Sequence, residues 1–118
     1  MMKVKFKLIF LLVGLTAILS SCRTSAPRLD YQALARASIL LGVDINLEDN
    51  HKLYLEAADW IGTPYRSGGD SKKGTDCSGM VCQIYRKVYR TQVPRNSEEL
   101  KNKSNKIAKR NLKEGDLV

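Results

Sequence analysis

The first 21 residues have the pattern of an export signal, and this limits how much chain is left to fold. Residues 1–7 alternate lysines with apolar residues, and Leu8–Leu19 is apolar except for Gly14 and Thr16. A basic start followed by a short apolar stretch is typical of a signal peptide, whereas a membrane-spanning helix needs about 20 apolar residues. The remaining 97 of the 118 residues are enough for one modest domain and too few for two.

The net charge relevant to binding is that of the chain without residues 1–21. Lys3, Lys5 and Lys7 belong to it, so the formal net charge of +8 at pH 7 falls to +5 when they are removed. The composition, 43% hydrophobic and 27% charged, excludes a wholly disordered or collagen-like chain. A charge of +5 favours anionic surfaces such as cell-wall polymers, but it does not indicate nucleic-acid binding, and we expect no nucleic-acid partner.

The signal ends in Leu19, Ser20, Ser21 and Cys22, and this run resembles the bacterial lipobox. In a lipobox, small residues precede a cysteine that receives a diacylglyceryl group before cleavage. The resemblance implies that Cys22 is lipidated and that residues 1–21 are removed. Two or more acyl chains on one residue anchor a protein stably, so we expect a lipid-anchored envelope protein facing the periplasm or the cell surface. The alternative is an ordinary secretory signal in which Cys22 is incidental.

Residues 22–48 are expected to link this anchor to a domain formed by residues 49–118. Arg23–Arg28 has the composition of a short polar tether. Leu29–Leu41 predicts a helix or helical linker, with Gly42 as its C-cap. The apolar residues that cluster toward one face of this helix are Leu34, Ala37, Ile39, Leu40 and Leu41.

A second helix is predicted after residue 50. Asp49 or Asn50 can cap its N-terminus, and Gly62 with Pro64 ends it. His51, the single histidine of the chain, lies beside the cap and is expected to be a solvated surface residue with no catalytic or ligand role. The positions that recur at helical spacing predict a face buried in the core: Leu53, Ala57, Trp60 and Ile61.

Cys77 carries the clearest chemical signal, because it opens a third predicted helix. Before it, Pro64 and the pair Gly68-Gly69 predict a tight loop. Free amides and the positive dipole end at a helix N-terminus stabilise a thiolate, which suits a nucleophile. Buried cysteines at helix starts are also common, so spacing alone leaves the choice open. The helix extends to about Tyr89 through the apolar positions Met80, Val81, Ile84 and Val88.

Five blocks of this sequence resemble the NlpC/P60 family in order and spacing. They are Ala58–Tyr65, Gly68–Gly69, Asp76–Val81, Pro94–Ser97 and Leu112–Val118. The family consists of papain-like cysteine peptidases that cut peptidoglycan stem peptides, typically between D-glutamate and a diamino acid. The resemblance therefore implies an α+β papain-like fold and an endopeptidase that acts on peptidoglycan stem peptides.

The resemblance also implies roles for individual residues. Cys77 would be the nucleophile, and Tyr65 would hold the reacting end of the substrate near the oxyanion site. The residues expected to contact the stem peptide are Asp76, Ser78, Arg95 and Ser97. Arg95 is equally compatible with a structural role. An acidic side chain beside the nucleophile suits a free amine, such as the L-alanine end of a stem peptide, better than it suits thiolate formation, so Asp76 is assigned to recognition.

The chain departs from the family pattern in one respect. The family's catalytic histidine and third polar residue follow the block Leu112–Val118, on strands of an antiparallel sheet, but no histidine follows Cys77 here, and His51 precedes it by 26 residues. We therefore expect a truncated fold, mainly α-helical with the sheet largely absent. Two functions stay open: an endopeptidase whose fragment here is inactive, and a non-catalytic envelope lipoprotein that binds muropeptide or a protein partner.

Cys82 is expected to be a small buried apolar residue. It lies five positions after Cys77, which is about 140° around a helix, too far apart for a disulfide. With Cys22 acylated, no cysteine pair remains, so we expect no disulfide, metal or cofactor.

A short helix is predicted after Asn96, which can form a capping box with Glu99 and turn Leu100 and Ile107 inward. The lysines and arginines around it favour a solvated face over a binding site for anionic wall polymers or lipid headgroups, because aromatic residues are not interleaved among them. These basic residues are Lys101, Lys103, Lys106, Lys109, Arg110 and Lys113.

Overall fold

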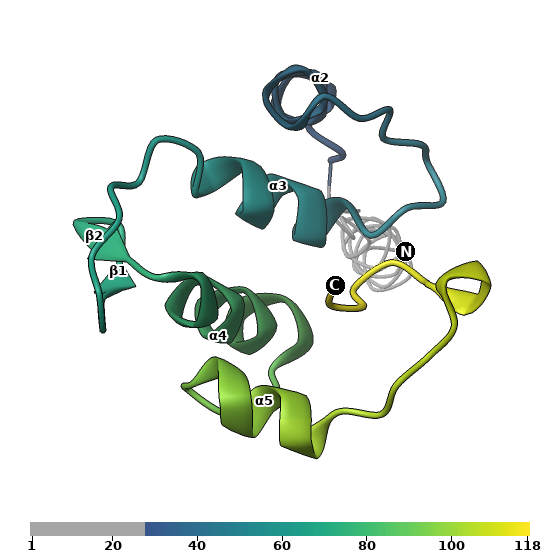
Figure 1. The fold of residues 1–118 in the computed structure, drawn as a ribbon. Helices are drawn as coiled ribbons and strands as arrows, with labels where there is room; N and C mark the ends of the chain where they lie inside the picture. Colours follow the sequence, from purple (N-terminus) through teal and green to yellow (C-terminus); the bar gives the residue numbers. More distant parts are fainter. Residues whose placement is uncertain (1–27) are drawn as a thin grey trace, which may run out of the picture.

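The computed structural model describes residues 28–118, which fold mainly into helices, with one small hairpin at the edge of the molecule next to α4 (Figure 1). In chain order the elements are α2 (Tyr31–Leu41), α3 (His51–Asp59), β1 (Asp70–Ser71), β2 (Gly74–Thr75), α4 (Cys77–Tyr89), α5 (Ser97–Lys103) and the 3₁₀ turn η1 (Lys109–Asn111). Helix α2 packs on α3, α3 packs on α4, and β1 lies against α4. The predicted α+β, mainly helical architecture with little sheet is confirmed for this part of the chain.

Every α-helix in residues 28–118 begins at a side-chain cap. The capping side chains, each accepting a hydrogen bond from a backbone amide of the first turn, are those of Asp30, Asn50, Asp76 and Asn96. Asn50, and not Asp49, is therefore the cap of α3. Gly42 ends α2 in the left-handed conformation, with φ 66°, as predicted. The predicted starts of α3, α4 and α5 are confirmed.

A small core lies where α2, α3 and α4 meet. Its buried apolar residues are Leu34, Ala37, Ala58, Trp60, Cys82 and Ile84. The indole N–H of Trp60 donates to Glu56 Oε1 at 3.0 Å, and the Lys87 ammonium lies 2.9 Å from the same oxygen. This network ties α3 to α4 beside the core. The predicted burial of Trp60, Ile84 and Cys82 is confirmed.

Several other predicted core positions are wrong. Ile39 and Leu40 are 81% and 54% exposed, and Ile61 is 55% exposed because it follows the end of α3, where the chain turns at Gly62. Ile107 lies beyond α5 and is 48% exposed. Helical periodicity identifies an apolar face, but within residues 28–118 the packed elements leave these positions open to solvent.

The tight loop predicted around Pro64 and Gly68-Gly69 leads into a hairpin that the sequence does not predict. The hairpin register pairs Asp70 with Thr75 and Ser71 with Gly74, and a separate bridge joins Tyr65 to Thr75. Strands of two residues show no alternation of apolar and polar positions, which is why the sequence did not reveal them. The hairpin turns the chain directly into α4 and so fixes where Cys77 emerges.

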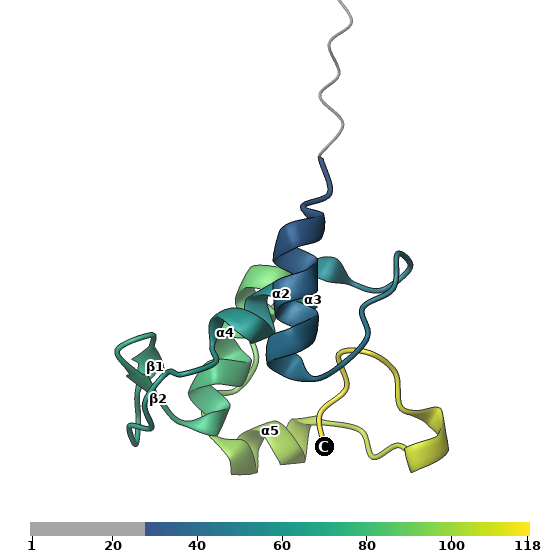
Figure 2. The same cartoon turned by 90° about the horizontal axis from the view of Figure 1, so that it is seen from above.

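The segment Leu112–Val118 docks against the far end of the helix pair. The Glu114 carboxylate accepts a hydrogen bond from the backbone N–H of Asn50 at 3.1 Å, and the Tyr85 hydroxyl donates to the carbonyl of Gly115. Figure 2 shows α5 at the N-terminal end of α4 and the C-terminal segment looping back toward it. Residues far apart in the sequence are therefore joined at the start of α3 and the C-terminal half of α4.

Several predictions lie outside the described residues. These are the signal peptide at 1–21, the lipidation of Cys22 and all but the last residue of the polar tether Arg23–Arg28. The division of the chain into a linker at 22–48 and a domain at 49–118 stays a prediction. In the part of the chain that the structure describes, none of the helices has the length and apolar character that a membrane crossing requires.

Candidate active site

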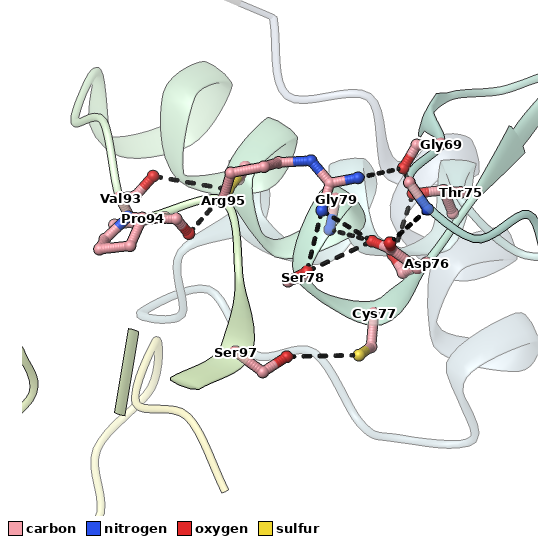
Figure 3. Close-up of polar contacts among 12 residues, drawn as sticks. Gly69, Thr75, Asp76, Cys77, Ser78, Gly79, Val93, Pro94, Arg95 and Ser97 are labelled. Atoms are coloured by element: carbon pink, nitrogen blue, oxygen red, sulfur yellow. Dashed lines mark hydrogen bonds and ion pairs between the residues drawn. The ribbon is translucent and has the colours of Figure 1, made fainter. Parts of the chain in front are cut away.

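Cys77 is the first residue of α4, and its thiol is free and exposed. The amides of the first helical turn have no carbonyl partner within the helix, and together with the helix dipole they favour an anion at this position. The hydroxyl of Ser97, the first residue of α5, lies 3.9 Å from Cys77 Sγ (Figure 3). The structure thus brings together two of the predicted site residues, which are 20 positions apart.

The Asp76 carboxylate is held by four hydrogen bonds. Its Oδ1 accepts from the backbone N–H of Gly79 at 2.8 Å, from Arg95 Nη1 at 2.9 Å and from Ser78 Oγ at 3.3 Å. Its Oδ2 accepts from the backbone N–H of Gly68 at 2.8 Å. The hydrogen bond from Arg95, followed by those from Gly79 and Gly68, holds the pKa of Asp76 well below its usual range. Asp76 is therefore a charged cap at neutral pH.

The Arg95 guanidinium joins three segments of the chain. Nη1 donates to Asp76 Oδ1 and to Ser78 Oγ, both at 2.9 Å, and Nη2 donates to the carbonyl of Gly69 at 2.8 Å. Figure 3 shows this side chain reaching from the segment before α5 across the first turn of α4 to the loop before the hairpin. Both Nη atoms of Arg95 therefore donate hydrogen bonds to acceptors within the protein.

Gly79 marks the point where that loop touches α4. A Cβ at this position would lie 2.9 Å from Thr75 Oγ1 and 3.0 Å from Arg95 Nη2, and it would overlap the carbonyl of Gly69. Only glycine leaves room for this approach. Sequence reasoning missed the backbone groups of Gly68 and Gly69 as partners of the site, although a glycine in the first turn of a helix was a signal that something packs closely there.

Tyr65 is a further predicted site residue, and His51 is the histidine that the sequence places beside a helix cap. The Tyr65 side chain is 80% exposed, and the structure ties this residue to Thr75 only through the backbone bridge. His51 Nε2 lies 2.7 Å from the carbonyl oxygen of Asn46, at the start of α3. Figure 1 shows that α3 and α4 run in opposite directions, so His51 lies at the far end of the pair from Cys77. The expected role of Tyr65 stays a prediction.

A cavity of about 640 Å³ extends from Cys77 along α5 to the C-terminal residues. Its lining includes the polar residues Cys77, Ser78 and Ser97, three lysines, and apolar residues such as Val81 and Leu100. Within residues 28–118, no group of three His, Cys, Asp or Glu side chains is placed to hold a metal ion. The thiol of Cys77 and the residues Ser78 and Ser97 therefore line a mainly apolar space.

The chain is similar to known proteins over the segment that builds this site. The sequence model of the NlpC/P60 family matches residues 62–118. A probable endopeptidase NlpC homolog of Haemophilus influenzae is 30% identical over 134 aligned residues, which cover 95% of this chain and 73% of that relative. The chain belongs to the NlpC/P60 family. The resemblance found in the sequence blocks is thereby confirmed.

Other relatives share shorter segments with this NlpC/P60 protein. The murein DD-endopeptidase MepS/murein LD-carboxypeptidase of Escherichia coli K12 is 37% identical over 73 residues, 62% of this chain and 39% of that enzyme. The gamma-DL-glutamyl hydrolase of Bacillus subtilis is 38% identical over 64 residues, 53% of this chain and 16% of that enzyme. The chain thus spans about two fifths of the E. coli relative.

Proposed function

We propose that this protein hydrolyses peptidoglycan stem peptides between D-glutamate and a diamino acid, with Cys77 as the nucleophile. The observation that carries the proposal is the exposed Cys77 thiol at the start of α4, facing the cavity that α5 borders. Relatives named as a murein endopeptidase and a gamma-DL-glutamyl hydrolase support both the polymer and the type of bond.

In this mechanism the Cys77 thiolate attacks the scissile carbonyl. The amine of the diamino acid leaves with a proton, and water then hydrolyses the thioester to release the D-glutamyl carboxylate and the free thiol. Amides of the first turn of α4 stabilise the oxyanion, and Tyr65 holds the reacting end of the substrate beside them. A base that moves the protons is required in both steps.

Recognition of the stem peptide is assigned to Asp76, Ser78 and Ser97. Asp76 Oδ2 accepts only one hydrogen bond in the structure, from Gly68, so it retains a lone pair for the substrate's free amine. Ser78 and Ser97 are among the residues that line the cavity. Neither the recognition nor the cleavage step requires a metal or cofactor.

We also propose that the protein is anchored in the cell envelope through lipidated Cys22, with residues 1–21 removed, 22–48 as the linker and 49–118 as the domain. The lipobox-like run that ends at Cys22 supports this location. Metabolic labelling with a palmitate analogue should tag the wild-type protein and not Cys22→Ala. A tag that persists in Cys22→Ala would contradict the anchor.

A second candidate function rests on the position of the histidine. The only histidine of the chain, His51, hydrogen bonds to Asn46 at the far end of α3, so residues 28–118 supply no imidazole beside Cys77. A protein of this structure can bind muropeptide, or a protein partner, through the same cavity without cleaving it. This second candidate is the non-catalytic envelope lipoprotein that the sequence leaves open.

Hydrolysis of a purified stem tetrapeptide separates the two functions when it is measured in a form of the protein that supplies a base beside Cys77, because residues 28–118 alone are expected to be inactive. Chromatography should show a dipeptide ending in D-glutamate, and Cys77→Ala should abolish it. Cys82→Ser is the matched control, because it replaces the buried thiol with a small hydroxyl that can still donate to Pro94. Peptide binding without any product, in both the wild type and Cys77→Ala, would support the non-catalytic function and contradict the hydrolase.

A further inference from the structure

The segment that carries Ser97 to Cys77 is fastened to α4 at two points. Cys82 Sγ donates to the carbonyl oxygens of Val93 at 3.5 Å and Pro94 at 3.2 Å. The next residue, Arg95, makes the three hydrogen bonds described above, to two side chains and one carbonyl. Ser97 follows two positions later, with its hydroxyl 3.9 Å from Cys77 Sγ. The position of Ser97 therefore depends on where Arg95 is held.

Asp76 creates an electrostatic problem beside the nucleophile. A carboxylate adjacent in sequence to Cys77 opposes formation of a second negative charge on the thiol. The Arg95 guanidinium lies 2.9 Å from Asp76 Oδ1 and balances that charge. Both partners are retained by further hydrogen bonds, Asp76 to the amides of Gly68 and Gly79, and Arg95 to Gly69.

We propose that Arg95 is a positioning residue for the nucleophile: it neutralises Asp76 beside Cys77 and holds Ser97 against the thiol. This goes beyond a contact to the stem peptide, because both Nη atoms already bond to protein acceptors. The inference rests on the proposed role of Cys77 as nucleophile. In this proposal the ion pair between Asp76 and Arg95 allows a charged helix cap and a reactive thiol to occupy neighbouring positions.

Alkylation of the thiols in the full chain tests this without any need for turnover. Iodoacetamide is neutral and iodoacetate is anionic, so the ratio of their rates at Cys77 reports the local charge. Mass spectrometry assigns the label to Cys77 or Cys82. The variants are Arg95→Gln, Asp76→Asn, the double variant and Arg95→Lys. Lys87→Gln is the control, because it removes an ion pair of the same 2.9 Å length that joins α4 to α3 away from the thiol.

We expect the ratio of iodoacetate to iodoacetamide labelling at Cys77 to follow the net charge of residues 76 and 95 in each variant. Arg95→Gln should lower the ratio of iodoacetate to iodoacetamide labelling at Cys77 by about threefold to tenfold, the scale of one uncompensated charge at short range. Asp76→Asn should raise the ratio, and the double variant should return it to the wild-type value. Arg95→Lys should keep the ratio, and Lys87→Gln should leave it unchanged.

Three results would overturn the proposal. They are an unchanged ratio in Arg95→Gln, a double variant that behaves like Arg95→Gln, and labelling of Cys82 as fast as Cys77 in Arg95→Gln, which would mean that Arg95 only maintains the fold. If the wild type hydrolyses stem peptide, Arg95→Gln and Arg95→Lys should lower kcat with KM changed less than about twofold, since both lose the three-way contact. A rise in KM alone would assign Arg95 to substrate binding.

Hydrolysis that survives Cys77→Ala would instead contradict the proposed function. The labelling ratios would still test the charge balance between Asp76 and Arg95 in that case.

Discussion

At the residue scale, Asp76 serves two purposes with one carboxylate. Its Oδ1 caps α4 through the amide of Gly79, and the same oxygen pairs with Arg95. A carboxylate is a good cap because it accepts from the free amides and complements the helix dipole. The guanidinium removes the cost of placing that charge next to Cys77. Residue type and position are therefore linked across 19 positions of the sequence.

This pairing predicts how stability depends on pH. The pKa of Asp76 is lower in the folded chain than its unfolded value of about 3.9, so its stabilising effect is complete above that pH and is lost as the pH falls toward the folded value. Arg95→Gln removes the largest cause of the lowered pKa. Thermal melts should show a deficit for Arg95→Gln at pH 7 that shrinks below about pH 4. A deficit that is constant from pH 7 to pH 2 would contradict this assignment, and Lys87→Gln serves as the control.

At the element scale, α4 is placed by its contacts with the loop and hairpin that precede it. The amide of Gly68 bonds to Asp76, the carbonyl of Gly69 accepts from Arg95, and Thr75 Oγ1 donates to that same carbonyl at 3.2 Å. The close approach requires a bare backbone at Gly79. The first turn of α4, and with it Cys77, is therefore fixed from both sides.

Substitution of Gly79 tests this close packing. Glycine to alanine inside a helix normally stabilises by about 1 kcal/mol, but here the added Cβ meets Thr75 Oγ1 and Arg95 Nη2 at 3.0 Å or less. Gly79→Ala should therefore destabilise the chain by about 1–3 kcal/mol in urea unfolding. Arg86→Ala, at an exposed position of the same helix, should change stability by less than about 0.5 kcal/mol. Stabilisation by Gly79→Ala would show that the loop does not press on α4.

The elements were predictable where local signals decide them. Asn50, Asp76 and Asn96 all precede helices and cap them, and the apolar spacing after Cys77 gives the full length of α4. The hairpin and the Arg95 network were not predictable, because they depend on backbone carbonyls and amides brought together by tertiary packing. A motif names Arg95, but only the packing shows which acceptors it meets.

At the scale of the whole molecule, little apolar surface is fully covered. Within residues 28–118, six apolar residues form the core, whereas Ile61, Ile107, Leu112 and Leu117 are each 40% exposed or more. Burial of apolar area contributes about 25 cal/mol per Å², and a domain is stable by only about 5–15 kcal/mol. Because these side chains stay largely exposed, a substantial part of the burial energy that they could contribute to stability is not gained.

The chain on its own should therefore be helical but loosely packed. Circular dichroism should show helix at 25 °C, while thermal unfolding should be broad and a hydrophobic dye should bind before the transition. The matched control is Ile107→Ser, which should reduce dye binding without loss of helix because Ile107 lies outside the core. A sharp cooperative melt with no dye binding would contradict this view of the packing.

The central claim is that catalysis depends on the thiol of Cys77, and one measurement tests it most directly. Stem-peptide hydrolysis is followed, in a form of the protein that supplies a base beside Cys77, during slow alkylation by iodoacetamide, while mass spectrometry gives the fraction of Cys77 modified at each time. The account predicts that activity falls in direct proportion to that fraction and reaches zero when Cys77 is fully labelled, with Cys82 still free. Activity that persists after complete modification of Cys77 would contradict it.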